Sequence, residues 1–473
     1  MPDTILHTRD GGDAVIDPAE VEALAAGLRG SVSLPADPGF DAARTLWNAM
    51  IDRKPGLVVH CRGAADVAAA VRFAAARRLL VSVRSGGHNI AGSAVCDGGL
   101  MIDLSPMTAV RVDPESGRVR VQPGATLGDL DRETKAYGLA VPVGINSTTG
   151  IAGLTLGGGF GWLSRKHGMT VDSLVSADVV MADGKTVIAD ATRNTDLFWA
   201  LRGGGGNFGV VTAFEFQARP VGPEVLSGLL VHPYEAAPEL LRRYRDLVAD
   251  APDDLTCWVV LRHAPPLPAL PEEWHGRPVM VLALCWAGDM AQGEKAVAPL
   301  RALGTPIADL VAPHPFVGWQ SAFDPLLEPG ARNYWKSHDL TALSDAAIDT
   351  LLAHVDHLPG QECEVFLAHL GGAMSRVAAD ETAYPHRDSH FVMNVHTRWR
   401  EASADAACVG WARGLFDAMT PHATGGVYVN FMPEDEADRT AGAYGPNLAR
   451  LRAIKRAVDP GNLFCVNQNI APA

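Results

Sequence analysis

The sequence RSGGHN, residues 84–89, is the stretch around which this chain is built. It joins two apolar runs, residues 79–83 and 100–104, which have the composition of buried strands. Two adjacent glycines permit positive φ and let the backbone come very close to a ligand. Successive backbone N–H groups in such a turn can bind an anion. We therefore predict that this turn holds the pyrophosphate of a dinucleotide, and that His88 contacts, or is bonded to, its redox-active ring.

Two further glycine tracts lie in the first half of the chain. They are GINSTTGIAGLTLGGGFGWLSRKHG, residues 144–168, and ALRGGGGNFGVVTAFEF, residues 200–216. None of the three tracts ends in the GK[ST] of a Walker P-loop. Gly204, Gly206 and Gly209 have the spacing of a Rossmann fingerprint, but they run into a strand-like segment where that motif opens a helix. The sequence therefore favours a dinucleotide site on another scaffold.

Length and composition indicate a multidomain globular protein. The chain has 473 residues, of which 47% are hydrophobic and 20% charged, and its net charge is −14. This charge argues against nucleic-acid or anionic-membrane partners. The N-terminus lacks a Sec signal pattern, and no stretch has the length of a membrane span. The seven cysteines are scattered without a CxxC pair, and no histidines have metal-site spacing. We expect a cytoplasmic enzyme with reduced thiols and no metal.

Hydrophobic periodicity predicts the elements. Asp17 caps a helix that runs to Gly30, and residues 57–83 form a β-α-β unit ending in the glycine turn. The texture changes near Pro220, after which helical patches alternate with strand-like runs, and a last amphipathic helix opens at Pro446. In this second region we expect helices over residues 235–247 and 343–354, and strands over residues 255–261, 279–286, 364–370 and 391–396.

Several ordered motifs together resemble the berberine-bridge-enzyme-like group of the vanillyl-alcohol-oxidase type of FAD-linked oxidases. They are RSGGHN with the following AGSAV and LMIDLS, VQPGATLGDL (121–130), LTLGGGFGWLSRKHG (154–168), DLFWALRGGGGNFGVVT (196–212), YVN (428–430) and YGPNLARLRAIKRAVDPGNLF (444–464). The match is weakest between residues 220 and 360. The resemblance implies an α+β fold in which a two-part FAD-binding domain, residues 1–218 and 428–473, carries a substrate domain, residues 219–427, with an antiparallel sheet.

The resemblance also implies cofactor contacts. His88 matches the histidine that is joined covalently to the flavin 8α-methyl group. Asn146 stands where many relatives carry a cysteine that forms a second link, so this chain is expected to hold FAD through one covalent bond only. The implied FAD-binding residues are Arg84, Ser85, Gly86, Gly87, His88, Asn89, Gly124, Asn146, Thr148, Gly150, Gly153, Gly158, Gly161 and Val211.

The resemblance further implies an oxidase. Hydride passes from a substrate C–H to flavin N5 while a base removes a proton from a neighbouring O–H or N–H. Tyr428 is the candidate base, and Asn430 accompanies it. Because the pKa of an unperturbed phenol is about 10, the pKa of Tyr428 must be lowered for this role. Lys336 is a possible source of the positive charge that this requires. The expected partners are dioxygen, which yields hydrogen peroxide, and a small alcohol, sugar or amine. Two alternatives remain: a flavin dehydrogenase with another acceptor, and a flavin-binding protein without turnover.

Overall fold

The start of the chain forms as its capping residues predict. The computed structural model describes residues 3–473, and it opens with the antiparallel hairpin β1 (Thr4–His7) and β2 (Asp13–Ile16). Helix α1 (Pro18–Ala26) follows; the Asp17 carboxylate accepts from the Ala19 N–H, and the Glu20 carboxylate accepts from the Asp17 N–H. This capping box is the predicted one, but the helix ends at Gly27 instead of Gly30.

A small sheet carries the RSGGHN turn. Its order is β3-β4-β6-β5, and β4, β6 and β5 are parallel; their bounds are β3 Ser31–Ser33, β4 Leu57–His60, β5 Val81–Arg84 and β6 Leu100–Asp103. Helix α3 (Ala64–Ala76) connects β4 to β5. The expected β-α-β unit is therefore present, but β6 lies between its two strands.

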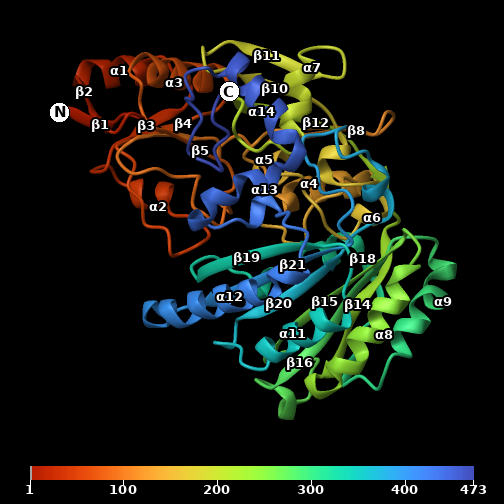
Figure 1. The fold of residues 1–473 in the computed structure, drawn as a ribbon. Coiled ribbons are helices and arrows are strands. Elements are labelled where there is room, and N and C mark those ends of the chain that lie inside the picture. Colours follow the sequence, from red (N-terminus) through yellow and green to blue (C-terminus); the bar gives the residue numbers. More distant parts are fainter. Residues whose placement is uncertain (1–2) are drawn as a thin grey trace.

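A second sheet carries the other two glycine tracts. Its order is β11-β10-β12-β8-β7, and every pair is antiparallel. The strands are β7 Val110–Asp113, β8 Arg118–Val121, β10 Leu174–Val180, β11 Thr186–Asp190 and β12 Val210–Gln217, and the helices between them are α4 Leu127–Thr134, α5 Ile151–Leu156, α6 Ser164–His167 and α7 Thr195–Leu201. Late in the chain, α13 (Thr440–Tyr444) and α14 (Leu448–Val458) return to this part, where Leu451 and Ile454 join its core (Figure 1).

The middle of the chain forms an 8-stranded sheet. Its order is β17-β14-β16-β15-β20-β21-β19, and β18 also pairs with β14. The strands are β14 Glu224–Pro233, β15 Leu255–His263, β16 Pro278–Trp286, β17 Ala308–Asp309, β18 Ala312–Pro315, β19 Arg332–Leu340, β20 Glu364–His369 and β21 Phe391–Trp399. All of its pairs are antiparallel. The predicted α+β class with an antiparallel second sheet is confirmed; the predicted domain limits stay a prediction.

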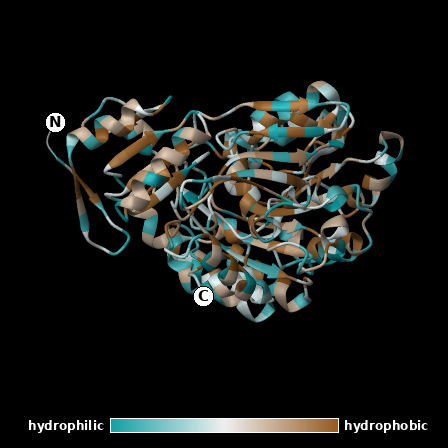
Figure 2. Ribbon diagram, turned by 90° about the horizontal axis from the view of Figure 1, so that it is seen from above, coloured by the Kyte–Doolittle hydropathy of each residue, from teal (hydrophilic) through white to brown (hydrophobic). Residues whose placement is uncertain are grey.

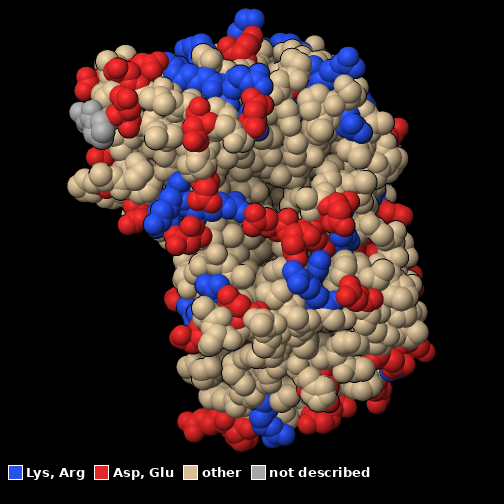
Figure 3. Space-filling model, turned by 60° about the vertical axis from the view of Figure 1, so that its left-hand side comes forward, with Lys and Arg blue, Asp and Glu red and all other residues tan. Residues whose placement is uncertain are grey.

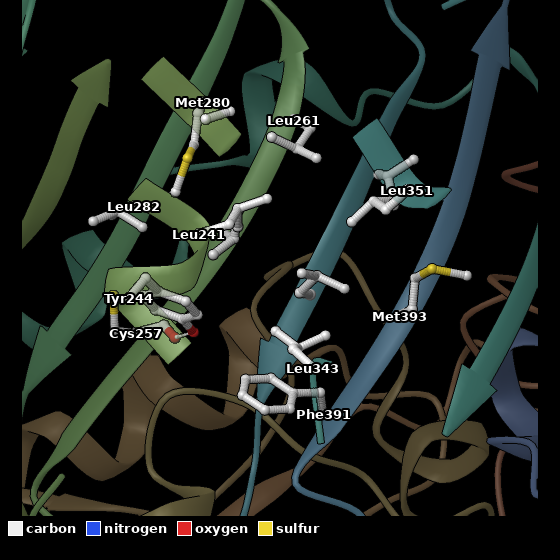
Figure 4. Close-up of a cluster of buried hydrophobic side chains, with 14 of the residues drawn as sticks. Leu241, Tyr244, Cys257, Leu261, Met280, Leu282, Leu343, Leu351, Phe391 and Met393 are labelled. Carbon is white, nitrogen blue, oxygen red and sulfur yellow. Dashed lines mark hydrogen bonds between the residues drawn. The ribbon is translucent and has the colours of Figure 1, made fainter. Parts of the chain in front are cut away.

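Four helices cover one face of the large sheet. They are α8 Ala237–Ala249, α9 Met290–Arg301, α11 Asp345–Val355 and α12 Asp405–Met419. Figure 4 shows the core that they bury, in which Leu241 and Tyr244 of α8 meet Leu261 of β15 and Leu351 of α11. Because these helices occupy one face, residues that alternate along each strand are divided between this covered face and the opposite one. The two smaller sheets lie in the other half of the molecule (Figure 1).

The surface carries charges of both signs. On the side shown in Figure 3, Lys and Arg groups lie beside Asp and Glu groups across the middle of the molecule. Figure 2 shows hydrophobic residues alternating with hydrophilic ones along the helices, as expected for elements with one buried face. Within residues 3–473, no helix has the length and apolarity that crossing a membrane requires. All seven cysteines are free, and only Cys465 is not fully buried.

Candidate active site

One large cavity lies where the glycine tracts face the large sheet. Eleven of the residues proposed from the sequence line it: Ser85, Gly86, Gly87, His88, Asn89, Asn146, Gly150, Gly153, Val211, Tyr428 and Asn430. Arg84, Gly124, Thr148, Gly158, Gly161 and Lys336 are not among its lining residues. Residues of all three glycine tracts thus line one site.

The RSGGHN turn packs directly on the second glycine tract. A Cβ on Gly86 would lie 2.5 Å from the Gly150 Cα, so neither position has room for a side chain. Gly87 has a φ of 68°, which favours glycine. The Arg84 guanidinium does not reach into the cavity, because it donates to the Ala43 carbonyl. The two backbones therefore form one continuous wall of the cavity without side chains.

His88 is held by two neighbours, Trp47 and Thr148. Its ring stacks on Trp47 with centroids 4.8 Å apart, and its Nε2 lies 2.9 Å from the Thr148 Oγ1. Thr148 in turn bonds to the Asn146 Oδ1 through both its hydroxyl, at 2.7 Å, and its backbone N–H, at 3.0 Å. Desolvation by the surrounding protein lowers the pKa of His88 to about 4, so the imidazole is neutral at physiological pH. Thr148 thus acts on the cavity through His88.

Tyr428 and Asn430 form a second polar group. The Tyr428 hydroxyl oxygen accepts from the Gly159 N–H at 3.0 Å and from the Asn430 Nδ2 at 2.9 Å. Asn430 also donates to the Leu154 carbonyl at 3.2 Å. Burial raises the pKa of Tyr428 to about 12, although both donors act to lower it. The lowered pKa that the sequence argument required is therefore not found in this set of residues.

Lys336 does not supply the missing positive charge. It lies on β19 next to Trp335, and because side chains alternate along a strand, Trp335 faces the cavity while Lys336 faces α12. The Lys336 Nζ pairs with the buried Glu436 carboxylate at 2.7 Å and lies 4.4 Å from the centre of the Phe416 ring. The role suggested for Lys336 beside Tyr428 is therefore wrong. Lys336 forms a structural ion pair with Glu436 on the other face of the sheet.

The large sheet contributes a third polar group. Arg262 on β15 pairs with Glu364 on β20 at 2.7 Å, and the His396 Nδ1 on β21 lies 3.3 Å from the same carboxylate. Burial raises the pKa of Glu364, but the charge of Arg262 and the hydrogen bond with His396 outweigh burial and hold this pKa at about 2. All three side chains line the cavity. The strands expected over residues 364–370 and 391–396 border the site.

Several lining residues were not predicted from the sequence. Trp47 lies in an irregular loop, and no periodicity or motif marks it. Arg262 and Trp335 lie on strands of the segment where the motif resemblance is weakest. The tail residues Asn467 and Gln468 also line the cavity, directly after the motif that ends at Phe464. Their place shortly after this motif was the only feature of the sequence that indicated a role for the tail.

Comparison with known proteins gives the class. A family model described as "FAD binding domain" matches residues 55–190, and one described as "Berberine and berberine like" matches residues 427–471. The (R)-6-hydroxynicotine oxidase of Paenarthrobacter nicotinovorans is 30% identical, over 94% of this chain and 97% of its own length. The uncharacterized FAD-linked oxidoreductase YgaK of Bacillus subtilis is 31% identical, over 94% and 97%.

A solved structure agrees with these matches. The carbohydrate oxidase of Microdochium nivale, crystallised with a substrate analogue, superposes with a TM-score of 0.83 at 27% identity and covers 96% of this chain and 99% of that one. Fold and site therefore define an FAD-linked oxidoreductase. Within that class, the chain belongs to the berberine-bridge-enzyme-like family.

The cavity fits FAD. Gly153 and Gly206 both line it, and a Cβ added at either would meet no protein atom within 4 Å, so the space in front of them is left for a ligand. The Gly86–Gly150 wall presents bare backbone, as close approach to a pyrophosphate requires. Val81, Val83 and Leu104 add an apolar wall beside this backbone. Backbone for phosphates and apolar surface for rings together suit the dinucleotide.

Proposed function

We propose that this protein holds FAD through a single covalent bond at His88 and oxidises a small metabolite with dioxygen as the electron acceptor. The observation that carries the proposal is the hydrogen-bonded series from His88 through Thr148 to Asn146 at the cavity wall. No cysteine is present among the described residues that line the cavity, so a second thioether link has no donor there. The family membership supports FAD as the cofactor.

The hydrogen bonds define which nitrogen of His88 is free to react. The Thr148 backbone N–H can only donate, so the Asn146 atom that it meets is the oxygen. That oxygen also receives the Thr148 hydroxyl proton, which leaves the Thr148 Oγ1 to accept from the His88 Nε2–H. The Nδ1 lone pair is then unprotonated, and it is the nucleophile that we propose for attachment to the flavin.

The other polar residues orient the substrate and move a proton. Bound FAD supplies the hydride acceptor N5 and the route by which electrons reach dioxygen, giving hydrogen peroxide. Tyr428 lines the cavity, and its oxygen, held by two N–H donors, takes the proton of the substrate O–H or N–H. Asn430 donates to that oxygen and stabilises the phenolate form of Tyr428, which accepts the proton and becomes the neutral phenol. The aromatic rings around Tyr428 keep water away from this transfer.

Oxygen consumption separates this proposal from its alternatives. We expect turnover of a metabolite to consume oxygen and release peroxide in equal amounts. A flavin dehydrogenase would be reduced by the substrate without air but would reoxidise only with another acceptor. A flavin-binding protein without turnover would show no anaerobic bleaching with any substrate. The covalent bond is tested separately, by ultraviolet fluorescence of the denatured protein after electrophoresis.

A further inference from the structure

Aromatic rings build the wall of the cavity opposite the glycine tracts. Trp258, Trp335 and Phe366 project from neighbouring parts of the large sheet, and Phe431 meets Trp335 at 5.5 Å and Phe366 at 5.9 Å between ring centroids. Trp258 and Phe366 are stacked at 5.8 Å with an interplanar angle of 8°. Tyr428, the proposed proton acceptor, lies 4.8 Å from Phe431. A flat ring is therefore the shape that this wall accommodates beside Tyr428.

The charges at this wall cancel. Among the described residues that line the cavity, Arg262 and Glu364 are the only Arg, Lys, Asp or Glu side chains, and they bond to each other at 2.7 Å. His396 lies against the same carboxylate. An ammonium or carboxylate group on a substrate would enter without a free counter-ion, and burying such a charge unpaired is costly. The site therefore favours an uncharged molecule.

Three polar side chains at the wall lack a partner in the protein, the Asn394 amide and the indole N–H groups of Trp258 and Trp335. Asn394 on β21 is 0% exposed, its Nδ2 and Oδ1 both lack a hydrogen-bond partner, and it lines the cavity beside Phe366, its cross-strand neighbour. Buried amides are normally bonded, and each exception calls for an explanation. A hydroxyl or carbonyl group of a ligand lying on Phe366 would satisfy Asn394.

The end of the cavity beyond the rings is aliphatic. Its walls are Val231, Val260, Leu267, Leu270, Val279 and Val281. A carbohydrate brings hydroxyl groups around its whole perimeter, and these aliphatic side chains offer them no partner. The polar side chains that border this end, Arg262 opposite Val279 and Glu364, are bonded to each other. An alkyl or aryl extension would instead bury apolar surface there.

We infer that the substrate is an uncharged molecule with an aromatic ring and an apolar extension, which stacks within the Trp258, Phe366 and Phe431 wall and forms a hydrogen bond with Asn394. Carbohydrates and cationic amines are expected to bind this site more weakly than such a molecule. The inference rests on the proposed function, because it names the substrate class of that same site.

Calorimetric titration of the FAD-loaded protein, with its flavin reduced beforehand and with air excluded, tests the preference without any turnover. The probes are 4-ethylbenzyl alcohol, its cationic analogue 4-ethylbenzylamine, and cellobiose, all at pH 7. We expect the alcohol to bind at least tenfold more tightly than either of the others. Equal or tighter binding of cellobiose or the amine, or no binding of the alcohol, would overturn the inference. Loss of covalent flavin or of oxygen consumption would instead refute the proposed function and leave this binding order unchanged.

Two variants give the test residue-level resolution. Asn394→Leu should weaken 4-ethylbenzyl alcohol about fivefold, the usual effect of one hydrogen bond, but should not weaken 4-ethyltoluene, which lacks the hydroxyl. Glu364→Gln leaves Arg262 without its carboxylate, so the affinity for 4-ethylbenzoate should rise at least tenfold. Equal losses for both ligands in Asn394→Leu, or unchanged benzoate binding in Glu364→Gln, would contradict the assigned contacts. Thermal melting of each variant confirms that it is folded.

Discussion

The rate of substrate oxidation should rise steeply with pH, and the rise should depend on Tyr428. Burial raises the pKa of this phenol to about 12. The base form is the phenolate, whose fraction is therefore about one in ten thousand at pH 8 and grows about tenfold with each pH unit up to the pKa. Between pH 7 and pH 10, the rate of anaerobic flavin reduction should thus increase about a thousandfold.

Stopped-flow absorbance at the flavin maximum measures this rate, with a substrate found by peroxide release. Tyr428→Phe should be slower by about 10²–10⁴-fold, the usual contribution of a general base, and should lose the pH dependence. Asn430→Ala removes one donor to the phenolate; a hydrogen bond to a charge contributes ~1.5–3 kcal/mol, so the rate at fixed pH should fall about 10- to 100-fold with the slope kept. A pH-independent rate in the unaltered protein, or the same slope in Tyr428→Phe, would refute the assignment.

Three further predictions concern the cofactor wall. Gly86→Ala should destabilise the protein by about 1–3 kcal/mol, read from its melting temperature, because its Cβ meets backbone, whereas Gly153→Ala should melt no lower but retain less FAD, because its Cβ meets only the cavity. Thr148→Val should slow covalent flavin incorporation about fivefold by loss of one hydrogen bond to His88, and Thr149→Val, whose side chain has no such bond, should not. Asn146→Cys should form a second flavin link; peptide mass spectrometry that finds flavin on His88 alone would contradict this.

Local patterns predicted the elements that local chemistry determines. The Asp17 capping box and the strand over residues 57–60 form as expected, because caps and short apolar runs carry their own signal. The order of strands did not follow from the sequence. β6 lies between β4 and β5. This order could not be predicted, because hydrophobic runs show that a strand is buried but not which strand lies beside it.

The site was predictable where the backbone makes it and not where side chains do. Gly86 and Gly150 could be predicted as part of the site, because their backbone contact leaves room only for glycine and glycine tracts are recognisable in a sequence. Trp47, which stacks on His88, lies in a loop without periodicity and had no signal. Lys336 was misjudged because the strand β19, with its alternation of faces, was not recognised in NYWKSHD. The motifs indicate which residue types the site contains. The face of the sheet toward which each side chain points is known only from the folded structure.

His88 is the residue that we propose as the single covalent anchor of FAD. The most direct measurement is ultraviolet fluorescence of acid-treated protein bands after denaturing electrophoresis, comparing the unaltered chain with His88→Ala and with Trp47→Phe, a control that keeps an aromatic ring against His88. We expect a fluorescent band for the unaltered chain and the control, and none for His88→Ala. A fluorescent His88→Ala band, or a dark band from the unaltered protein, would contradict it.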